Sequence, residues 1–546
     1  MLASRTLSNM TLPTLEIEDW KNLGTFKKAL EENVLPSYLP QCRWYRSKAK
    51  SINRIKVLPC PSLSDNDFHL LRIRVEHMDA SSEDYLLPLT MVTENQTAFN
   101  FSQINPQAIL GKIEGENALV IDAIYDESFR RSLFNAIQNG TSISDENGTI
   151  QCETGTVLKN NRIPSRAITS RVLNAEQSNT SIIYNDQYFL KIFRKLEYGL
   201  NPDLEVVRFL SEKTLFNNAP TYGGSLLFLE EKKRPIILGL IQNKIDNRGD
   251  AWSTMLEDLE AYYDRVAAIE SDKTPKLLQK ERLYFMDTPA KVRHLIGRST
   301  YKRVTNLAKR TAEMHIALAS DQEDDGFMPC DFCQEDQEAL YKNQVQLVND
   351  QLTALQGQLN VFPKQVAAEA QTVINYKAQI LQILENIIQA PIKATQTRVH
   401  GDYHLGQVLD DGEDFYIIDF EGEPMRPIEE RRSKTSPFKD VAGMVRSFHY
   451  AAYGELYLHP EKYAQDDLPK LEYWAAQWFH YISRFYLTAY FDRTESQGFI
   501  PTDKKQLQTL LRTFIIEKAI YEVGYEMNNR PNWLKIPLRG VLYELQ

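Results

Sequence analysis

The sequence is organised around one stretch, His400–Glu423, which reads HGDYHLGQVLDDGEDFYIIDFEGE. A polar cluster opens the stretch, and a short apolar run, FYII at 415–418, ends it just before Asp419. An Asp-Gly turn lies between them and favours a tight hairpin, because glycine accepts a positive φ at no steric cost. Such a hairpin would bring Asp402, Gln407 and Asp419 to one end of a two-stranded ribbon.

These three side chains form the set that phosphoryl transfer needs. A carboxylate such as Asp402 orients the attacking hydroxyl, while an amide oxygen of Gln407 and a carboxylate of Asp419 hold Mg²⁺ on the nucleotide phosphates. A surface hairpin that happens to be acidic has similar residue types, so composition alone leaves both interpretations open. The order H-G-D-x-H-x-x-Q followed by I-I-D-F-E is more specific. It resembles the catalytic and metal loops of kinase-like phosphotransferases that act on small molecules, with Glu421 where protein kinases have the Gly of D-F-G.

Length and composition indicate an enzyme-sized globular protein. A chain of 546 residues predicts two or three domains, and 42% hydrophobic with 25% charged residues is ordinary for such proteins. The formal charge of −10 argues against a nucleic-acid or anionic-membrane partner. No apolar run approaches the ~18 residues needed to span a bilayer, and no apolar core for a secretion signal follows the first residue. We therefore expect a cytoplasmic protein, in which the CxxC pair Cys330 and Cys333 is incidental.

The first 115 residues are expected to form a small α+β module. Apolar spacing predicts a helix over 14–36, and a basic, aromatic surface loop with a half-buried Trp44 follows. Strands are expected at 52–58, 69–76 and 85–92. A second helix is predicted over 118–139, ending at a glycine.

A nucleotide-binding lobe is expected from Arg166 onward. Strands are predicted at 169–173, 182–184 and 188–193. The polar segment between the first two can lay backbone N–H groups and hydroxyls over phosphates, as a Gly-rich loop does, although it contains no glycine. The residues expected to contact nucleotide here are Gln177, Ser178, Asn179, Thr180 and Ser181.

A lysine and a glutamate complete the expected phosphate site. Lys191 lies inside an apolar strand, where a charge is costly unless it is paired. Glu205 follows in a helix that starts at Pro202. A strand lysine paired with a helix glutamate is how kinases hold the α- and β-phosphates. The alternative is a lysine on an edge strand that extends its ammonium into solvent.

The rest of the chain reads as helical after a buried strand at 234–243. Helices are predicted over 306–319, 336–359, 364–389, 438–453, 471–490 and 504–527. Their tyrosines and tryptophans are expected mostly in the core, with a few lining a substrate cleft.

Taken together, the motifs resemble those of bacterial maltokinases over nearly the whole chain. They are EQSNTS at 176–181, LKIFRKLE at 190–197, NPDLE at 201–205, GDAW at 249–252, RTAEMHIALA at 310–319, DFEGEP at 419–424, ERRSKTSP at 430–437 and DVAGMVRSF at 440–448. The segment Arg43–Lys48 resembles the RWFGGK element of the maltokinase cap module, with Arg46 and Ser47 in place of its two glycines.

The resemblance implies an α+β, bilobal kinase-like fold. It would have an N-terminal cap module over 1–115, a nucleotide-binding N-lobe over 116–242 and a mainly helical C-lobe over 243–546. The implied activity is transfer of the γ-phosphoryl group of ATP to the anomeric hydroxyl of maltose, giving maltose 1-phosphate for α-glucan synthesis from trehalose. A non-covalent complex with trehalose synthase is the implied partnership, because the chain has no room for that enzyme's barrel.

Carried over by position, Asp402 is the catalytic base, and Gln407 and Asp419 hold Mg²⁺. Lys191 binds phosphate and Glu205 positions Lys191. His400 is expected to hold the loop. By resemblance to kinase folds, Asp440 would hydrogen-bond the backbone of the catalytic loop without binding metal. The basic run Arg426, Arg431, Arg432 and Lys434 is expected to be solvated or ion-paired, with one or two members able to face the cleft.

Two other functions fit the same motifs. An aminoglycoside or aminosugar phosphotransferase needs an acidic site for its cationic substrate, whereas the acidic run here is followed at once by arginines, which favours a neutral sugar. A pseudokinase partner of trehalose synthase is disfavoured because Lys191, Asp402, Gln407 and Asp419 are present together.

Overall fold

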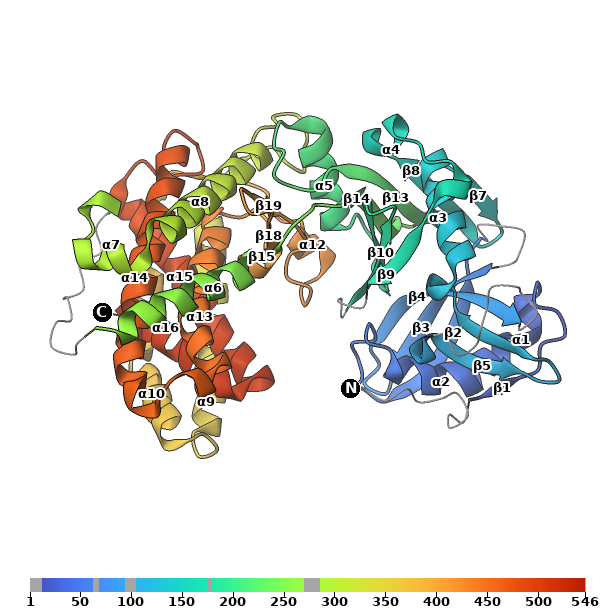
Figure 1. Ribbon diagram of the computed structural model, residues 1–546, viewed down its shortest axis with the longest axis horizontal. Helices are drawn as coiled ribbons and strands as arrows, with labels where there is room; N and C mark the ends of the chain where they lie inside the picture. Colours follow the sequence, from blue (N-terminus) through green and yellow to red (C-terminus); the bar gives the residue numbers. More distant parts are fainter. Residues whose placement is uncertain (1–11, 62–67, 94–104, 174–177, 270–284, 546) are drawn as a thin grey trace. The chain divides into compact units, whose positions relative to one another are not determined.

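The computed structural model describes residues 12–61, 68–93, 105–173, 178–269 and 285–545. The chain forms two compact units (Figure 1). The N-terminal unit comprises residues 1–212 and 220–244, and the C-terminal unit comprises 213–219 and 245–546. The expected cap module and N-lobe thus lie in one unit, and the expected helical lobe corresponds closely to the other.

The first sheet of the N-terminal unit is mixed, with strand order β1-β5-β6-β4-β3-β2 and β12 paired to β4. Its strands are β1 (Thr14–Leu15), β2 (Ile52–Pro59), β3 (Phe68–His77), β4 (Ser82–Thr93), β5 (Ile109–Ile113), β6 (Ala118–Asp122) and β12 (Lys195–Leu196). The helical segments α1 (Leu23–Ala29), η2 (Leu30–Val34), α2 (Leu35–Tyr38) and η3 (Leu39–Gln41) bury apolar side chains in the same core as β2, β3 and β4. The three strands predicted between 52 and 92 are confirmed.

Two helix predictions in this region are wrong in part. The helix expected over 14–36 begins only at Leu23, after Asn22 caps it by accepting the N–H of Gly24, because residues 14–15 pair with β5. Residues 118–122, expected to be helical, form the buried strand β6. The helix α3 (Glu127–Asn139) starts after Asp126, whose carboxylate accepts the N–H of Phe129.

The second sheet of this unit is antiparallel, with strand order β7-β8-β13-β14-β11-β10-β9. Its strands are β7 (Ser142–Asp145), β8 (Gly148–Thr154), β9 (Ser170–Leu173), β10 (Asn179–Tyr184), β11 (Tyr188–Phe193), β13 (Tyr222–Leu229) and β14 (Ile236–Asn243). The shorter helices beside it are α4 (Thr156–Asn160), α5 (Pro202–Lys213) and the single turns η5 (Pro106–Ala108), η6 (Ala123–Tyr125) and η7 (Ser165–Ala167). The strands predicted at 169–173, 182–184, 188–193 and 234–243 are confirmed.

One buried arginine ties the two sheets together. Arg194, directly after β11, donates to Asp122 of β6 at 2.6 Å and to Thr180 of β10 at 2.8 Å. Its guanidinium lies 5.0 Å from the ring centroid of Trp44. Trp44 and Tyr45 are both buried. The segment expected to be a surface loop therefore sends its two aromatic side chains into the core, while Arg43, Arg46 and Lys48 stay exposed.

The C-terminal unit is mainly helical, and the helices predicted there are confirmed, with the one expected over 364–389 split in two. The longer helices are α6 (Ala251–Ala267), α7 (Ala290–Ile296), α8 (Arg298–Leu318), α9 (Gln334–Gln358), α10 (Lys364–Asn375), α11 (Lys377–Glu385), α13 (Phe438–Leu458), α14 (Leu468–Thr494), α15 (Lys504–Asn529) and α16 (Lys535–Leu545). The short turns are α12 (Ile428–Arg431), η8 (Phe285–Asp287), η9 (Leu405–Gln407), η10 (Pro460–Lys462), η11 (Gln465–Asp467) and η12 (Pro531–Trp533).

Two small sheets complete this unit. The strands β15 (Gly249–Asp250), β18 (Val408–Asp410) and β19 (Phe415–Ile417) form one, and β16 (Cys330–Asp331) pairs with β17 (Thr395–Gln396) in the other. Across the described ranges, no helix has the length and apolar character needed to cross a membrane.

Candidate active site

The predicted hairpin is present and brings two of its three expected site residues into contact. Strands β18 and β19 pair in antiparallel register, with Val408 opposite Ile417. Gln407 lies just before β18 and Asp419 just after β19. The Gln407 side-chain amide donates to Oδ2 of Asp419 at 3.0 Å.

The backbone at Asp419 has an uncommon conformation. Its φ is 65°, in the left-handed region that few residues other than glycine adopt. The turn aims the carboxylate back toward Gln407 instead of continuing the strand. A carboxylate oxygen of Glu421 also lies within 4.8 Å of a carboxylate oxygen of Asp419. Amide and carboxylate oxygens are the donors that Mg²⁺ prefers, so the chemistry of this set fits the ion.

Asp440, on the first turn of α13, holds the segment 400–404, which contains Asp402 and is the expected catalytic loop. Its buried carboxylate accepts the backbone N–H groups of His400 at 2.7 Å and Gly401 at 2.9 Å. It also pairs with Nε2 of His315 at 3.1 Å. Burial alone would raise the pKa of Asp440, but the hydrogen bond and charge of His315, the charge of His400 and the N–H of Gly401 together hold that pKa below its ordinary value. The expected loop-holding role of Asp440 is confirmed.

His400 is bonded in the way expected of a structural residue. Its Nε2 lies 2.9 Å from the carbonyl oxygen of Ile418, which ties the catalytic loop to the strand that leads into Asp419. The ring packs against Tyr403 and Phe420, with centroids 5.2 and 5.0 Å away. His400 therefore joins the expected catalytic loop to the segment around Asp419, the expected metal loop.

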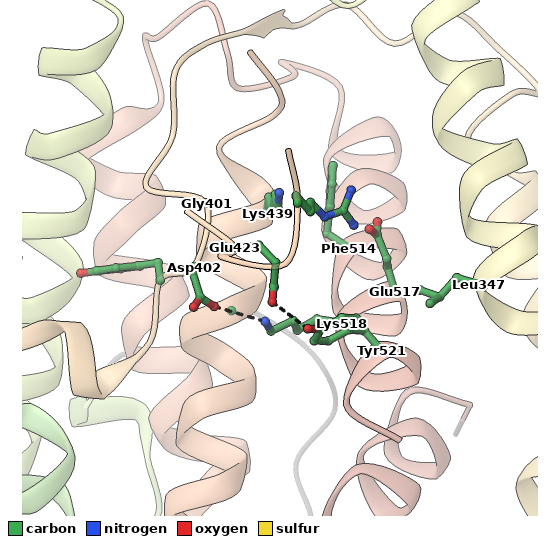
Figure 2. Close-up of a pocket in the computed structure, with 12 residues that line it drawn as sticks. Leu347, Gly401, Asp402, Glu423, Lys439, Phe514, Glu517, Lys518 and Tyr521 are labelled. Atoms are coloured by element: carbon green, nitrogen blue, oxygen red, sulfur yellow. Dashed lines mark hydrogen bonds and ion pairs between the residues drawn. The ribbon is translucent and has the colours of Figure 1, made fainter. Parts of the chain in front are cut away.

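Asp402 faces a cation that the sequence did not predict. Oδ1 of Asp402 lies 3.7 Å from Nζ of Lys518 on α15, as Figure 2 shows. Burial alone would lower the pKa of Lys518, but the charge of Asp402, with those of two nearby glutamates, raises it. Lys518 therefore carries its charge beside the candidate catalytic carboxylate.

An aromatic pocket opens next to this pair. It has a volume of about 430 Å³ and includes Asp402 and Lys518 in its wall. The aromatic side chains that line it are Trp252, Tyr450, Tyr521, Tyr525 and Trp533. They come from α6, α13, α15 and η12, so only the folded helical unit brings them together. Flat rings beside polar groups suit a ligand with both apolar faces and hydroxyl edges.

The expected nucleotide-contacting residues lie in the N-terminal unit. Gln177 falls outside the described residues. Ser178 directly precedes β10, and Asn179, Thr180 and Ser181 are its first residues. Ser181 is opposite Lys191 in the β10–β11 register, which brings these two expected phosphate contacts together.

Lys191 has a buried acidic partner on α5 that the sequence analysis did not name. Its Nζ lies 3.0 Å from Oδ2 of Asp203, and both side chains are buried. Glu205, the expected partner, lies two residues further along α5, with its N–H bonded to the carbonyl of Asn201 at 3.0 Å. Sequence reasoning missed Asp203, because either acid on the first turn of α5 fits the strand-to-helix pattern.

Comparison with known proteins bears first on the N-terminal unit. Residues 38–126 match the family model described as the maltokinase N-terminal cap domain. This match covers most of the first sheet, including β6 and the segment around Trp44.

Two curated relatives match about a quarter of the chain. A stretch of 143 residues is 29% identical to a glucosamine kinase of Mycolicibacterium smegmatis and covers 25% of this chain and 32% of that protein. A stretch of 139 residues is 27% identical to a glucosamine kinase of Streptacidiphilus jiangxiensis and covers 26% and 29%. The matched stretches therefore span about a third of the length of these relatives.

A solved structure matches nearly the whole fold. It is a glucosamine kinase in complex with glucosamine, ADP and inorganic phosphate, with a TM-score of 0.62 and 16% identity over 95% of this chain and 99% of that one. The chain thus has an α+β, kinase-like fold. With its cap domain it is maltokinase-like, as the sequence motifs led us to expect.

Proposed function

We propose that this protein is a sugar kinase that transfers the γ-phosphoryl group of ATP to the anomeric hydroxyl of maltose, giving maltose 1-phosphate. The observation that carries the proposal is the position of Asp402, in the wall of an aromatic pocket and on the same fixed loop system as Gln407 and Asp419. The maltokinase-type cap domain supports the choice of sugar.

The phosphoryl-transfer roles follow from the donor types. Asp402 accepts the proton of the sugar hydroxyl and orients it for attack. Gln407 and Asp419 would hold Mg²⁺, which neutralises charge on the phosphates. Lys191, positioned by acidic residues on α5, would bind phosphate oxygens. Ser178, just before β10, and Asn179 and Ser181 on β10 would contact the nucleotide, whereas the buried hydroxyl of Thr180 already accepts from Arg194.

The cation beside Asp402 favours a neutral sugar. Lys518 puts a positive charge beside Asp402, where the ammonium of an aminosugar would be repelled. The glutamates that line the pocket are already hydrogen-bonded. Glu423 accepts from Tyr521 at 2.7 Å, Glu522 from Arg446 at 2.8 Å and Glu526 from Arg530 at 2.6 Å.

The size and lining of the pocket are compatible with two sugar rings. A volume of about 430 Å³ falls in the range of roughly 300–1,000 Å³ that is usual for small-molecule sites. Tyr450 and Trp533, with ring centroids 6.3 Å apart, offer flat surfaces for sugar faces. A second ring held there would fix the pose of the reacting ring, which lowers the entropic part of the barrier.

A second candidate is an aminosugar kinase. It is favoured by the names of the matched relatives, which are glucosamine kinases. The pocket wall also has five carboxylates that would attract an ammonium, those of Asp250, Asp402, Glu423, Glu522 and Glu526.

A substrate panel separates the two. The purified protein is incubated with ATP and Mg²⁺ and with maltose, trehalose, glucose or glucosamine, and the phosphorylated position is read by NMR. Maltose should be the best substrate and should be phosphorylated at its anomeric oxygen. Trehalose has no free anomeric hydroxyl and should be inert, and glucose should be poor because it lacks the second ring. Glucosamine as best substrate, or phosphate at another maltose hydroxyl, would overturn the proposal.

The resemblance also supports a metabolic setting, in which maltose 1-phosphate feeds α-glucan synthesis from trehalose. A non-covalent complex with trehalose synthase would deliver maltose directly. Co-purification of the two proteins, followed by light scattering of the mixture, tests this partnership. Two separate monodisperse species at micromolar concentration would argue against it.

A further inference from the structure

A second cavity lies on the other side of the catalytic loop. It has a volume of about 450 Å³, and its wall includes Gly401 and Glu423. The basic residues that line it are Arg426, Arg431, Lys434 and Lys439. We call it the basic cavity. None of the roles proposed above uses these cations.

The two arginines are engaged with the loop that forms the wall. Arg426 pairs with Glu430 at 3.2 Å. Arg431 donates to the carbonyl oxygens of Arg426 at 3.0 Å and Glu421 at 3.3 Å. They shape the cavity and contribute positive charge, but much of their hydrogen-bonding capacity is already used.

The two lysines of the basic cavity, unlike the two arginines, keep their hydrogen-bonding capacity. Within the described parts of the chain, the ammonium groups of Lys434 and Lys439 have no hydrogen-bond or ion-pair partner. Both side chains are only partly exposed. Figure 2 shows Lys439 and Lys518 as separate cations on either side of Glu423. Lys518 is paired with Asp402 at 3.7 Å, whereas Lys439 forms no ion pair of this kind with a described residue and feels the charges of Glu517 and Asp440 only at longer range.

The surroundings of Lys439 increase the need for an anion. Burial lowers the pKa of Lys439, and the nearby charge of Arg426 lowers it further. The N-terminus of the long helix α13 starts at Phe438 and adds partial positive charge at the same place. Two carboxylates in the wall, those of Glu423 and Glu430, offset part of this charge, and the charges of Glu517 and Asp440 also act on Lys439. With four cationic side chains against two carboxylates in its wall, the cavity keeps an excess of positive charge, which favours an anion.

We propose that the basic cavity binds a phosphate dianion, either inorganic phosphate or the phosphate of a sugar phosphate, through Lys434 and Lys439. Thr435 and Asn343 also line the cavity and offer a hydroxyl and an amide for further hydrogen bonds. The site borders the catalytic loop through Gly401, so a phosphate bound here lies near Asp402 but outside the aromatic pocket.

The test is a binding measurement that needs no turnover. The full chain is titrated with inorganic phosphate by calorimetry, at constant ionic strength in chloride buffer and without nucleotide or sugar. The double variant Lys434→Met/Lys439→Met should bind at least ~10-fold more weakly, because each lysine supplies a charge-assisted hydrogen bond. The outcome of this binding measurement does not depend on which sugar the enzyme phosphorylates.

Matched variants keep the result specific. Lys434→Arg/Lys439→Arg should retain binding, which shows that charge and not folding was lost. Lys504→Met removes an exposed lysine of the same unit and should bind as the wild type does. Lys191→Met should also retain the site, since that lysine lies in the N-terminal unit.

The possible outcomes decide the proposal. No measurable phosphate binding by the wild type, or equal binding by the double methionine variant, overturns it. Loss of binding in Lys191→Met alone would place the phosphate elsewhere and overturn it too. Glucose 1-phosphate distinguishes the two sources: tighter binding than inorganic phosphate, lost in the double variant, assigns the site to a sugar phosphate. Equal affinity assigns it to free phosphate.

Discussion

Nζ of Lys518 lies 3.7 Å from Oδ1 of Asp402, so the candidate catalytic carboxylate faces a lysine from a helix far along the chain. This lysine should set the preference between neutral and cationic sugars. In Lys518→Met, Asp402 loses its counter-ion, and the ammonium of glucosamine can take its place. The ratio of kcat/KM for glucosamine to that for maltose should rise by roughly tenfold or more.

Lys518→Arg is the matched control, because it keeps the charge and should keep the maltose preference. Steady-state kinetics with both sugars measure the ratio. An unchanged ratio in Lys518→Met would show that the lysine has no part in selecting the sugar.

Asp402 itself is tested by a change that preserves its shape. In Asp402→Asn the side chain can no longer accept the proton of the sugar hydroxyl, so kcat should fall by ~10²-fold or more. Nucleotide affinity, measured by calorimetry with a non-hydrolysable ATP analogue, should change little. Near-normal turnover of this variant would mean that another residue is the base.

Asp419 requires a substitution that respects its backbone. Because its φ is 65°, alanine there would combine loss of a ligand with backbone strain, whereas asparagine tolerates the left-handed region. Asp419→Asn should therefore keep its melting temperature and lose nearly all activity at ordinary Mg²⁺ concentrations. Gln407→Ala removes a neutral ligand, and excess Mg²⁺ should partly restore its activity. Full activity of Asp419→Asn at ordinary Mg²⁺ would exclude a metal role for Asp419.

Local signals explain why this part of the site could be predicted from sequence. The Asp-Gly turn determines the hairpin, and the hairpin determines that Gln407 and Asp419 meet. The role of Asp440 was expected only from the resemblance to kinase folds, since no local signal links it to the N–H of His400. Gln407 and Asp419, by contrast, are close in sequence and are brought together by the hairpin itself.

The parts that were missed depend on contacts between distant segments. Lys518 is one polar residue among many on a long helix, and nothing in its neighbours indicates that it faces Asp402. Residues 118–121 are all apolar, and a helical turn follows the strand, so the periodicity does not separate strand from helix here. Trp44 was expected to be half-buried in a surface loop, because its basic neighbours suggested a solvated segment, while it packs in the core of the first sheet and against Arg194.

The last prediction concerns acid stability and rests on His449, buried in α13. Burial lowers the pKa of His449 well below its ordinary value, and the charges of Arg446 and Arg539 lower it further. The unfolded chain therefore binds this proton more readily than the folded one. As the pH falls below about 6.5, the free energy of unfolding should fall, by at most ~1.4 kcal/mol per pH unit from this group.

His449→Phe should remove this contribution. The ring of His449 packs against Tyr453 and Phe479, with centroids 4.9 and 4.8 Å away, and its Nδ1 has no hydrogen-bond partner among the described residues. A phenyl ring therefore suits the site. Denaturant unfolding, followed by tryptophan fluorescence at pH 7, 6 and 5, gives the free energy of unfolding for both proteins. The wild type should lose more stability than His449→Phe between pH 6.5 and 5, by at most ~2 kcal/mol. Since all other groups titrate in both proteins, parallel curves would show that His449 does not bind its proton differently in the two states.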